Sequence, residues 1–256
     1  MNNKKRKKIS PESYQDRIYR KNISADGLVS SYVSVKETDL HILAAGEIAK
    51  DGYDSVHRYR NQLENYIGSH PDFLTVLVPL KPDPLAPPII KDMLQAATAA
   101  NVGPMAAVAG AIAEYVGRDL LETGLEEVVV ENGGDIFLKR NRECTTAIFA
   151  GTSPLSQKVG VRIAPEHMPL GICTSSGTVG HSLSLGQADS VTVLASSTPM
   201  ADAAATLLGN EASSGGKENI NHVLEVARTI PGLLGVVIIC GEQMGAWGEI
   251  DLVGLD

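Results

Sequence analysis

Apolar residues along the chain alternate in some stretches and recur every three or four positions in others, and these two patterns predict its strands and helices. Residues 190–196 alternate β-branched and other apolar residues, which predicts a buried strand. Thr198 is then a good helix N-cap, and Pro199 suits the first helical position. Asp202 therefore falls in the first turn of the expected helix, with Thr206 four residues later on the same face.

The same patterns place the other elements. Upstream they predict a hairpin that turns at 36–39, a helix at 49–67, a short buried strand at 73–78, and two helices within 90–123 with a break at 101–104. Downstream they predict a strand, a tight turn and a strand within 126–140, strands at 145–151, 159–164 and 172–176, a helix at 219–229 and a closing hairpin at 235–253. The second helix of 90–123 is so rich in Ala and Gly that it must pack closely against another backbone.

Length and charge fit one compact domain that follows a basic tail. The 256 residues can bury a large and mainly aliphatic core, since aromatic residues make up only 4%. Eight of the 22 Lys and Arg residues but only two of the 30 Asp and Glu residues lie in 1–22, which predicts a disordered tail and leaves the domain at 23–256 near −14. This acidic balance disfavours nucleic acid as a partner. The proline-rich segment 79–88 either separates two subdomains or crosses within one domain.

The chain carries no sign of export or of a membrane anchor. No apolar run approaches the roughly 20 residues of a membrane span, and no apolar stretch follows the basic start, so we expect a cytoplasmic protein. Cys144, Cys173 and Cys240 lie far apart without C-x-x-C spacing, which disfavours a disulfide framework or a zinc site. We expect all three to be free thiols in buried strands.

Asp202 and Thr206 are the first candidates for chemistry. A carboxylate and a hydroxyl on adjacent helical turns offer hard oxygen ligands to Mg²⁺, whose other ligands would be waters and phosphate oxygens. The phosphates would then lie against the N-terminus of the same helix and the Gly133–Gly134 amides, because both favour anions. The alternative is structural: an aspartate that favours the helix dipole and a threonine that packs.

Two loops are further candidates. Gly133 and Gly134 allow positive φ and leave N–H groups uncovered, which suits a phosphate, although Asn-Gly is also the strongest short signal of a plain hairpin turn. Residues 175–187 form a loop of small polar residues that contains His181. Such loops approach ligands closely, but a single loop histidine is more often a surface residue.

Two separated motifs give the chain a family likeness. The stretch VTVLASSTPMADAAATLLG resembles the signature of the ApbE-like flavin transferases, in which a strand leads into a helix bearing D-A-x-A-T. Upstream, LLETGLEEVVVENGGDI resembles the same family's helix, strand and N-x-G-G-D turn. The likeness covers about residues 103–256 in the same order and spacing. The amino-terminal part is similar to a short, functionally uncharacterised branch of that superfamily.

The resemblance implies a mixed α+β fold, related to the T-fold, that binds FAD and Mg²⁺ in a single compact domain. In that family FMN is transferred from FAD to a Ser or Thr hydroxyl of an acceptor protein, and AMP is released. Carried over, Asp202 and Thr206 would bind the metal, and Asp202 and His181 would be the catalytic residues. The cofactor would lie against one turn and one strand end: Gly133, Gly134 and Asp135, and Thr174, Ser175 and Ser176.

Three departures from the family's pattern bear on activity. The family's Lys-Gly segment is matched by Ala109–Gly110, so a basic partner for phosphate is missing. Glu131 stands where the family has the asparagine of N-x-G-G-D, and no Asp-Pro follows His181. Two hypotheses therefore stay open: a Mg²⁺-dependent flavin-nucleotide transferase or FAD-diphosphate-cleaving enzyme, and a non-catalytic binder of flavin or another small metabolite. A homo-oligomer is compatible with both.

Overall fold

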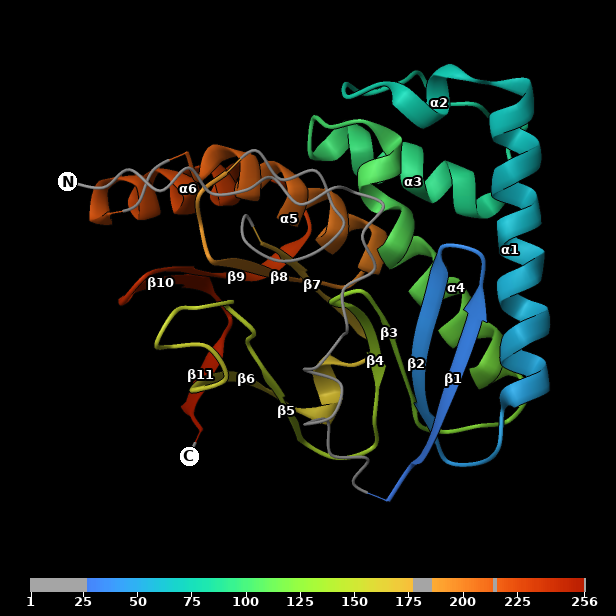
Figure 1. Cartoon of the computed structure of the whole chain (residues 1–256), viewed down its shortest axis with the longest axis horizontal. Coiled ribbons are helices and arrows are strands. Elements are labelled where there is room, and N and C mark those ends of the chain that lie inside the picture. Colours follow the sequence, from blue (N-terminus) through green and yellow to red (C-terminus); the bar gives the residue numbers. More distant parts are fainter. Residues whose placement is uncertain (1–26, 177–185, 214–215, 256) are drawn as a thin grey trace.

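The computed structural model describes residues 27–176, 186–213 and 216–255, in which helices cover one face of a long antiparallel sheet (Figure 1). Eight strands form this sheet in the order β1-β2-β3-β4-β7-β8-β9-β10, and each neighbouring pair is antiparallel. They are β1 (Val29–Val35), β2 (Thr38–Ala44), β3 (Val128–Asn132), β4 (Asp135–Lys139), β7 (Leu170–Ser175), β8 (Ser190–Ala195), β9 (Leu233–Cys240) and β10 (Gln243–Gly248).

A smaller sheet of three strands, in the order β11-β6-β5, packs on the other face. Its strands are β5 (Cys144–Ala147), β6 (Val159–Ile163) and β11 (Asp251–Gly254). Leu138 and Ile172 of the large sheet share one buried cluster with Val161 and Ile163 of the small sheet. In Figure 1 the small sheet lies below β7–β9 while α5 and α6 lie above them.

The helices form two neighbouring groups on the opposite face of the large sheet. They are α1 (Ala49–Ser69), α2 (Asp72–Thr75), α3 (Pro88–Ala99), α4 (Val108–Glu122), α5 (Thr198–Glu211) and α6 (Lys217–Thr229), with short 3₁₀ turns at Pro104–Ala107 and Pro165–His167. The first core joins α1, α3 and α4 to β1–β4, and the second joins α5 and α6 to β7–β10. Ala203 of α5 belongs to the first core, so α4 and α5 meet where the two groups touch.

The contact between α4 and α5 is unusually close because Gly110 has no side chain. A Cβ atom at this position would lie 2.6 Å from the carbonyl oxygen of Thr198 and 2.9 Å from Cβ of Asp202. This distance confirms the prediction that the helix rich in Ala and Gly packs against another backbone. It also brings the first turn of α4 beside the acidic side chain of α5.

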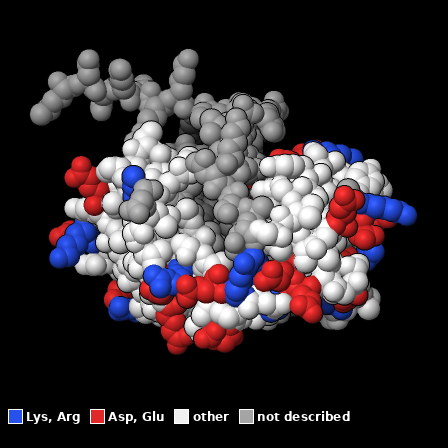
Figure 2. All heavy atoms as spheres, turned by 90° about the horizontal axis from the view of Figure 1, so that it is seen from below, with Lys and Arg blue, Asp and Glu red and all other residues white. Residues whose placement is uncertain are grey.

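Charged side chains on the surface mix both signs. Figure 2 shows one face on which Asp and Glu side chains lie beside Lys and Arg side chains along the rim. Four carboxylates of the described residues are buried instead, with exposed fractions of 9% or less: Glu114, Glu131, Asp135 and Asp189. Burial of a carboxylate is costly unless it accepts hydrogen bonds, so these four residues indicate where the interior contains hydrogen-bonding groups.

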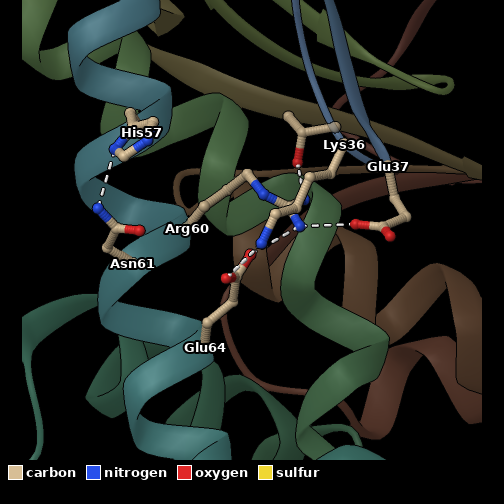
Figure 3. A network of polar contacts seen from close by, with 7 residues as sticks. Lys36, Glu37, His57, Arg60, Asn61 and Glu64 are labelled. Carbon is tan, nitrogen blue, oxygen red and sulfur yellow. Dashed lines mark hydrogen bonds and ion pairs between the residues drawn. The ribbon is translucent and has the colours of Figure 1, made fainter.

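A polar network joins the β1–β2 hairpin to α1 (Figure 3). Arg60 of α1 donates to the carboxylates of Glu37 at 2.6 Å and Glu64 at 2.9 Å, and Lys36 pairs with Glu64 at 2.7 Å. Arg60 also donates to Oγ1 of Thr38 at 2.7 Å. Glu37 and Glu64 are exposed, so solvent screens these ion pairs and they add little to stability; the network orients the hairpin rather than forming a site.

Most predicted elements are confirmed, together with the α+β fold class. The hairpin turns at Lys36 and Glu37, the long helix runs from Ala49 to Ser69, and the helical stretch is broken between Ala99 and Pro104. The closing hairpin is confirmed as β9 and β10, and β11 then continues into the small sheet.

The prediction of a buried strand at 73–78 is wrong. Residues 72–75 form the short helix α2, of which only Phe73 is buried, and Leu77 and Val78 are 74% and 60% exposed. A short apolar run cannot be assigned to strand or helix by periodicity alone, and residues 73–78 belong to neither sheet. The proline-rich segment beyond it leads into α3, and Phe73 and Ile89 on its two sides pack in the same core.

The predicted start of α5 is wrong by one residue. Ser197 is the N-cap and Thr198 is already helical, so Asp202 lies in the second turn and not in the first. The helix dipole therefore does not explain an aspartate here.

Among the described residues no single helix is long and apolar enough to cross a membrane. Within the described ranges, one pair of helices, Pro88–Ala99 with Pro104–Glu122, passes that test when taken together, and the pair is bent by 108°.

Candidate active site between α4, α5 and the β3–β4 turn

Asp202 points from α5 to the N-terminus of α4. Its Oδ2 accepts the backbone N–H of Gly110 at 2.8 Å, across 92 positions of sequence. The first N–H groups of a helix have no partner within the helix, and a carboxylate there is favoured by the helix dipole. Asp202 thus caps a helix other than its own, which is a role that sequence spacing does not reveal.

The electrostatic surroundings of Asp202 disfavour its charged form. The residue as a whole is partly exposed, but its carboxyl group is enclosed by protein, and this burial raises its pKa well above the usual value. The nearby Asp135 carboxylate raises it further. The N–H groups of Gly110 and Ala109 oppose this shift. Burial, Asp135 and Asp202 together also raise the pKa of the Cys173 thiol, which donates to the carbonyl oxygen of Thr198 at 3.5 Å. The carboxyl groups of Asp135 and Asp202 and the thiol of Cys173 therefore lie close together near the β3–β4 turn.

The β3–β4 turn is fixed by side chains on both of its flanks. Gly133 and Gly134 have φ values of 71° and 106°, the left-handed conformation that glycine adopts without strain. Oε1 of Glu131 accepts the Gly134 N–H at 2.8 Å, and Nδ2 of Asn132 donates to the carbonyl oxygen of Ala109 at 3.1 Å. The second bond ties the turn to the first turn of α4, beside Asp202.

The N–H groups expected to bind a phosphate are in part taken by the protein's own carboxylates. At the start of α5, the Thr198 N–H donates to Oε2 of Glu114 at 2.5 Å, and both residues are buried. The Thr198 N–H could therefore bind a ligand anion only if the carboxylate of Glu114 moved away. The Gly134 N–H is likewise used by Glu131.

The end of β7, which the family resemblance implies as part of a cofactor site, lies beside the turn. Gly134 faces the carbonyl oxygen of Thr174, which a Cβ atom on the glycine would approach to 3.8 Å. Thr174 shares a hydrogen bond of 2.9 Å with Thr192 of β8, and Ser176 donates to the carbonyl oxygen of Asp189 at 2.8 Å. Ser175 is buried at the end of the strand.

Thr206 and His181 are the remaining candidate residues from the sequence. Thr206 lies one helical turn beyond Asp202 on α5 and is partly exposed. His181 lies outside the described residues. Sequence reasoning missed Glu114 and Cys173 as parts of this region. A charged residue four positions after Gly110 in a helix of Ala and Gly was a usable signal for Glu114, whereas nothing distinguished Cys173 from an ordinary strand residue.

The donor atoms at Asp202 are of the kind that Mg²⁺ prefers, namely carboxylate and hydroxyl oxygens. A cation would also relieve the repulsion between Asp202 and Asp135, to which the raised pKa of Asp202 is partly due. Within the described ranges, however, no group of three or more His, Cys, Asp or Glu side chains is arranged to hold a metal ion. Protein ligands alone would leave the six-coordinate shell of Mg²⁺ incomplete, so waters and ligand oxygens would have to complete it.

A hollow of about 200 Å³ lies elsewhere, between the two sheets. It is lined by the beginning of β7 at Leu170, the end of β8 at Leu194 and Ser196, and Arg162 of β6. Leu170 and Leu194 belong to the buried cluster between the two sheets, whereas Asp202 lies on α5, on the opposite face of the large sheet. This hollow is therefore not part of the Asp202 region.

The fold described above is that of the flavin transferases. ApbE of Vibrio cholerae superposes with a TM-score of 0.56 at 14% identity, covering 86% of this chain and 96% of that one. The flavinyl transferase ApbE of Pseudomonas stutzeri gives the same TM-score and identity, covering 86% and 94%. At this identity the likeness establishes the fold alone.

Comparison with known sequences identifies the family of this chain. A family model described as "AbpE bacteria" matches residues 21–246. UPF0280 proteins of Methanococcus aeolicus and Methanococcus maripaludis are 39% identical over 230 residues and 43% identical over 221 residues. These matches cover 87% and 85% of this chain and 91% and 90% of those proteins. The chain belongs to this ApbE-like family.

Proposed function

We propose that this protein binds FAD together with Mg²⁺ and cleaves its diphosphate, transferring FMN to a Ser or Thr hydroxyl of an acceptor protein or to water. The observation that carries the proposal is the position of Asp202. Its carboxylate lies beside that of Asp135, at the N-terminus of α4 and below the β3–β4 turn, in a fold shared with flavin transferases.

The chain's own residues would contribute position and charge. Asp202 and Thr206 would hold the cation from two turns of one helix, while the β3–β4 turn and the end of β7 would bound the space for the nucleotide. When bound, Mg²⁺ supplies charge neutralisation at the diphosphate, which is the main requirement of phosphoryl transfer. Ala109 provides no basic side chain, so this chain depends on the cation for that neutralisation.

A second candidate is a binder of flavin or another small metabolite that performs no chemistry. It is favoured by the two glutamates that occupy N–H groups suited to phosphate, Glu114 at Thr198 and Glu131 at Gly134. If a neutral part of the ligand, and not its phosphates, lay against these groups, the site would need no basic side chain.

One experiment separates the two candidates. The purified protein is incubated with FAD, with and without Mg²⁺, and bound flavin, AMP and FMN are measured. Release of AMP that requires Mg²⁺ supports the enzyme, and FMN in free or protein-bound form then identifies the acceptor as water or protein. Intact bound flavin without AMP supports the binder. Absence of both binding and cleavage contradicts the proposed function.

A further inference from the structure

We propose that Glu131 determines specificity at this site: its carboxylate keeps anionic groups away from the β3–β4 turn and reserves the turn for an uncharged part of the ligand. The inference rests on the proposed function in that it concerns the same site. It goes beyond that function by stating which part of a flavin nucleotide the turn accepts.

The geometry of the β3–β4 turn supports the proposal. Gly133 and Gly134 both have positive φ, and successive N–H groups in such a turn form a concavity that favours anions. In this chain the Gly134 N–H is already directed at Oε1 of Glu131, 2.8 Å away. A phosphate oxygen that approached this N–H would have to displace the carboxylate or share the donor with it.

The position of Glu131 makes such displacement difficult. The residue is only 3% exposed and lies within β3, between register partners on both sides, His41 of β2 and Ile136 of β4. His41 is itself buried and shares a hydrogen bond of 2.7 Å with Ser30. A side chain enclosed on both flanks has little room to swing away, so its carboxylate stays at the turn.

The surrounding charge acts in the same direction. Asp135 begins the strand directly after the turn and is 7% exposed, and its carboxylate acts on Asp202 below. A phosphate at the turn would meet Glu131 and Asp135 in a poorly solvated place, where repulsion between like charges is screened little. The diphosphate of a nucleotide is therefore expected at a cation near Asp202, and the turn contacts a neutral part of the ligand.

The test separates the charge of Glu131 from its hydrogen bond. In Glu131→Gln the side-chain amide oxygen still accepts the Gly134 N–H, but the negative charge is gone. Calorimetry with inorganic pyrophosphate plus Mg²⁺ and, separately, with uncharged riboflavin compares this variant with the wild type. We expect the variant to bind pyrophosphate about tenfold more tightly, the effect of removing one like-charge contact of about 1.4 kcal/mol, and to bind riboflavin unchanged.

Glu127→Gln is the matched control. Glu127 precedes the same strand and also accepts a backbone N–H, from Asn141 at 2.7 Å, at the far end of the β3–β4 hairpin, where it is in addition 3.4 Å from Nε of Arg140. It should leave pyrophosphate affinity unchanged, whereas equal gains in both variants would show a general charge effect and overturn the proposal. Unchanged or undetectable pyrophosphate binding by a folded Glu131→Gln protein would also overturn it.

The proposed function is tested by a different measurement. FAD binding by the wild-type protein in the presence of Mg²⁺ tests that function, whatever Glu131→Gln does. A wild-type protein that binds FAD while Glu131→Gln gains no affinity for pyrophosphate refutes only the role of Glu131. A gain in the variant without FAD binding by the wild type refutes only the flavin function.

Discussion

Asp202 serves the fold before any ligand is bound. Its Oδ2 accepts the Gly110 N–H of a neighbouring helix, while its negative charge is disfavoured by burial and by Asp135. The hydrogen bond and the charge are separable, because a neutral amide can provide the first without the second. Substitutions at this one position can therefore distinguish a structural role from a role in metal binding.

Two substitutions at Asp202 are expected to behave differently. Asp202→Ala leaves the Gly110 N–H without a partner in the interior and should lower the free energy of unfolding by about 1–3 kcal/mol. Asp202→Asn retains an acceptor and removes the repulsion from Asp135, so it should be as stable as the wild type. Both should lose Mg²⁺-dependent binding of FAD. Urea unfolding and calorimetry measure the two effects, and an Asp202→Asn protein that binds FAD and Mg²⁺ normally would contradict the metal role.

Tyr59 provides a pH-dependent contribution to stability. Burial, with a hydrogen bond of 2.7 Å to Asp119, raises its pKa to about 12. Unfolding returns the phenol to its ordinary pKa of about 10, so the unfolded chain releases the proton first as pH rises. The contribution is complete below pH 10 and is lost as pH rises to about 12.

The matched measurement is the stability difference between the wild type and Tyr59→Phe across that range. The wild type should be more stable near neutral pH by about the 1 kcal/mol of a typical hydrogen bond, and the difference should shrink as pH rises above 10. Urea unfolding at several pH values gives the difference directly. A difference that stays constant up to pH 12 would show that Asp119 does not hold the phenol in its protonated form.

The contact between α4 and α5 depends on the glycine at position 110. A methyl group there would meet the Thr198 carbonyl oxygen at 2.6 Å, closer than any stable packing allows, so Gly110→Ala must separate the two helices. We expect a loss of about 1–3 kcal/mol in unfolding free energy, together with weaker ligand binding at Asp202.

Gly68→Ala in α1 is the control for helical glycines. A methyl group at position 68 meets nothing within 4 Å, so the substitution should stabilise the protein by up to about 1 kcal/mol through helix propensity. Thermal unfolding of both variants measures the contrast. Equal effects of the two substitutions would show that the close approach of α4 and α5 is not needed.

Sequence patterns predicted most of the helices and strands well, but not the contacts between them. Periodicity located α1 and the β3–β4 hairpin, because each presents one apolar face to a core. It failed at 73–78, where a run of apolar residues is exposed, and it misplaced the cap of α5. The bonds from Asp202 to Gly110 and from Thr198 to Glu114 join positions 92 and 84 apart, so local spacing contains no trace of them.

At the scale of the whole molecule, the interior protects two of the three thiols. Cys173 and Cys240 are buried free cysteines, while Cys144 on β5 is partly exposed, which corrects the prediction that all three are buried. Burial also raises the pKa of both protected thiols, so less of the reactive thiolate forms.

Thiol titration should therefore report global unfolding. Under native conditions Cys144 should react first, and all three thiols should react in denaturant. Cys144→Ser is the control, since this variant should react slowly until the protein unfolds. Fewer than three reactive thiols in the unfolded wild type would contradict the assignment of free cysteines, and rapid reaction of native Cys173 would contradict its burial.

The hydrogen bonds between α4 and α5 run in both directions. Glu114 of α4 accepts the first N–H of α5, and Asp202 of α5 accepts an N–H in the first turn of α4. This exchange of caps fixes how far one helix can slide along the other. Folding therefore uses a hydrogen-bond acceptor at position 202 whether or not a ligand binds, so the motif D-A-x-A-T by itself does not show that a protein carrying it is active.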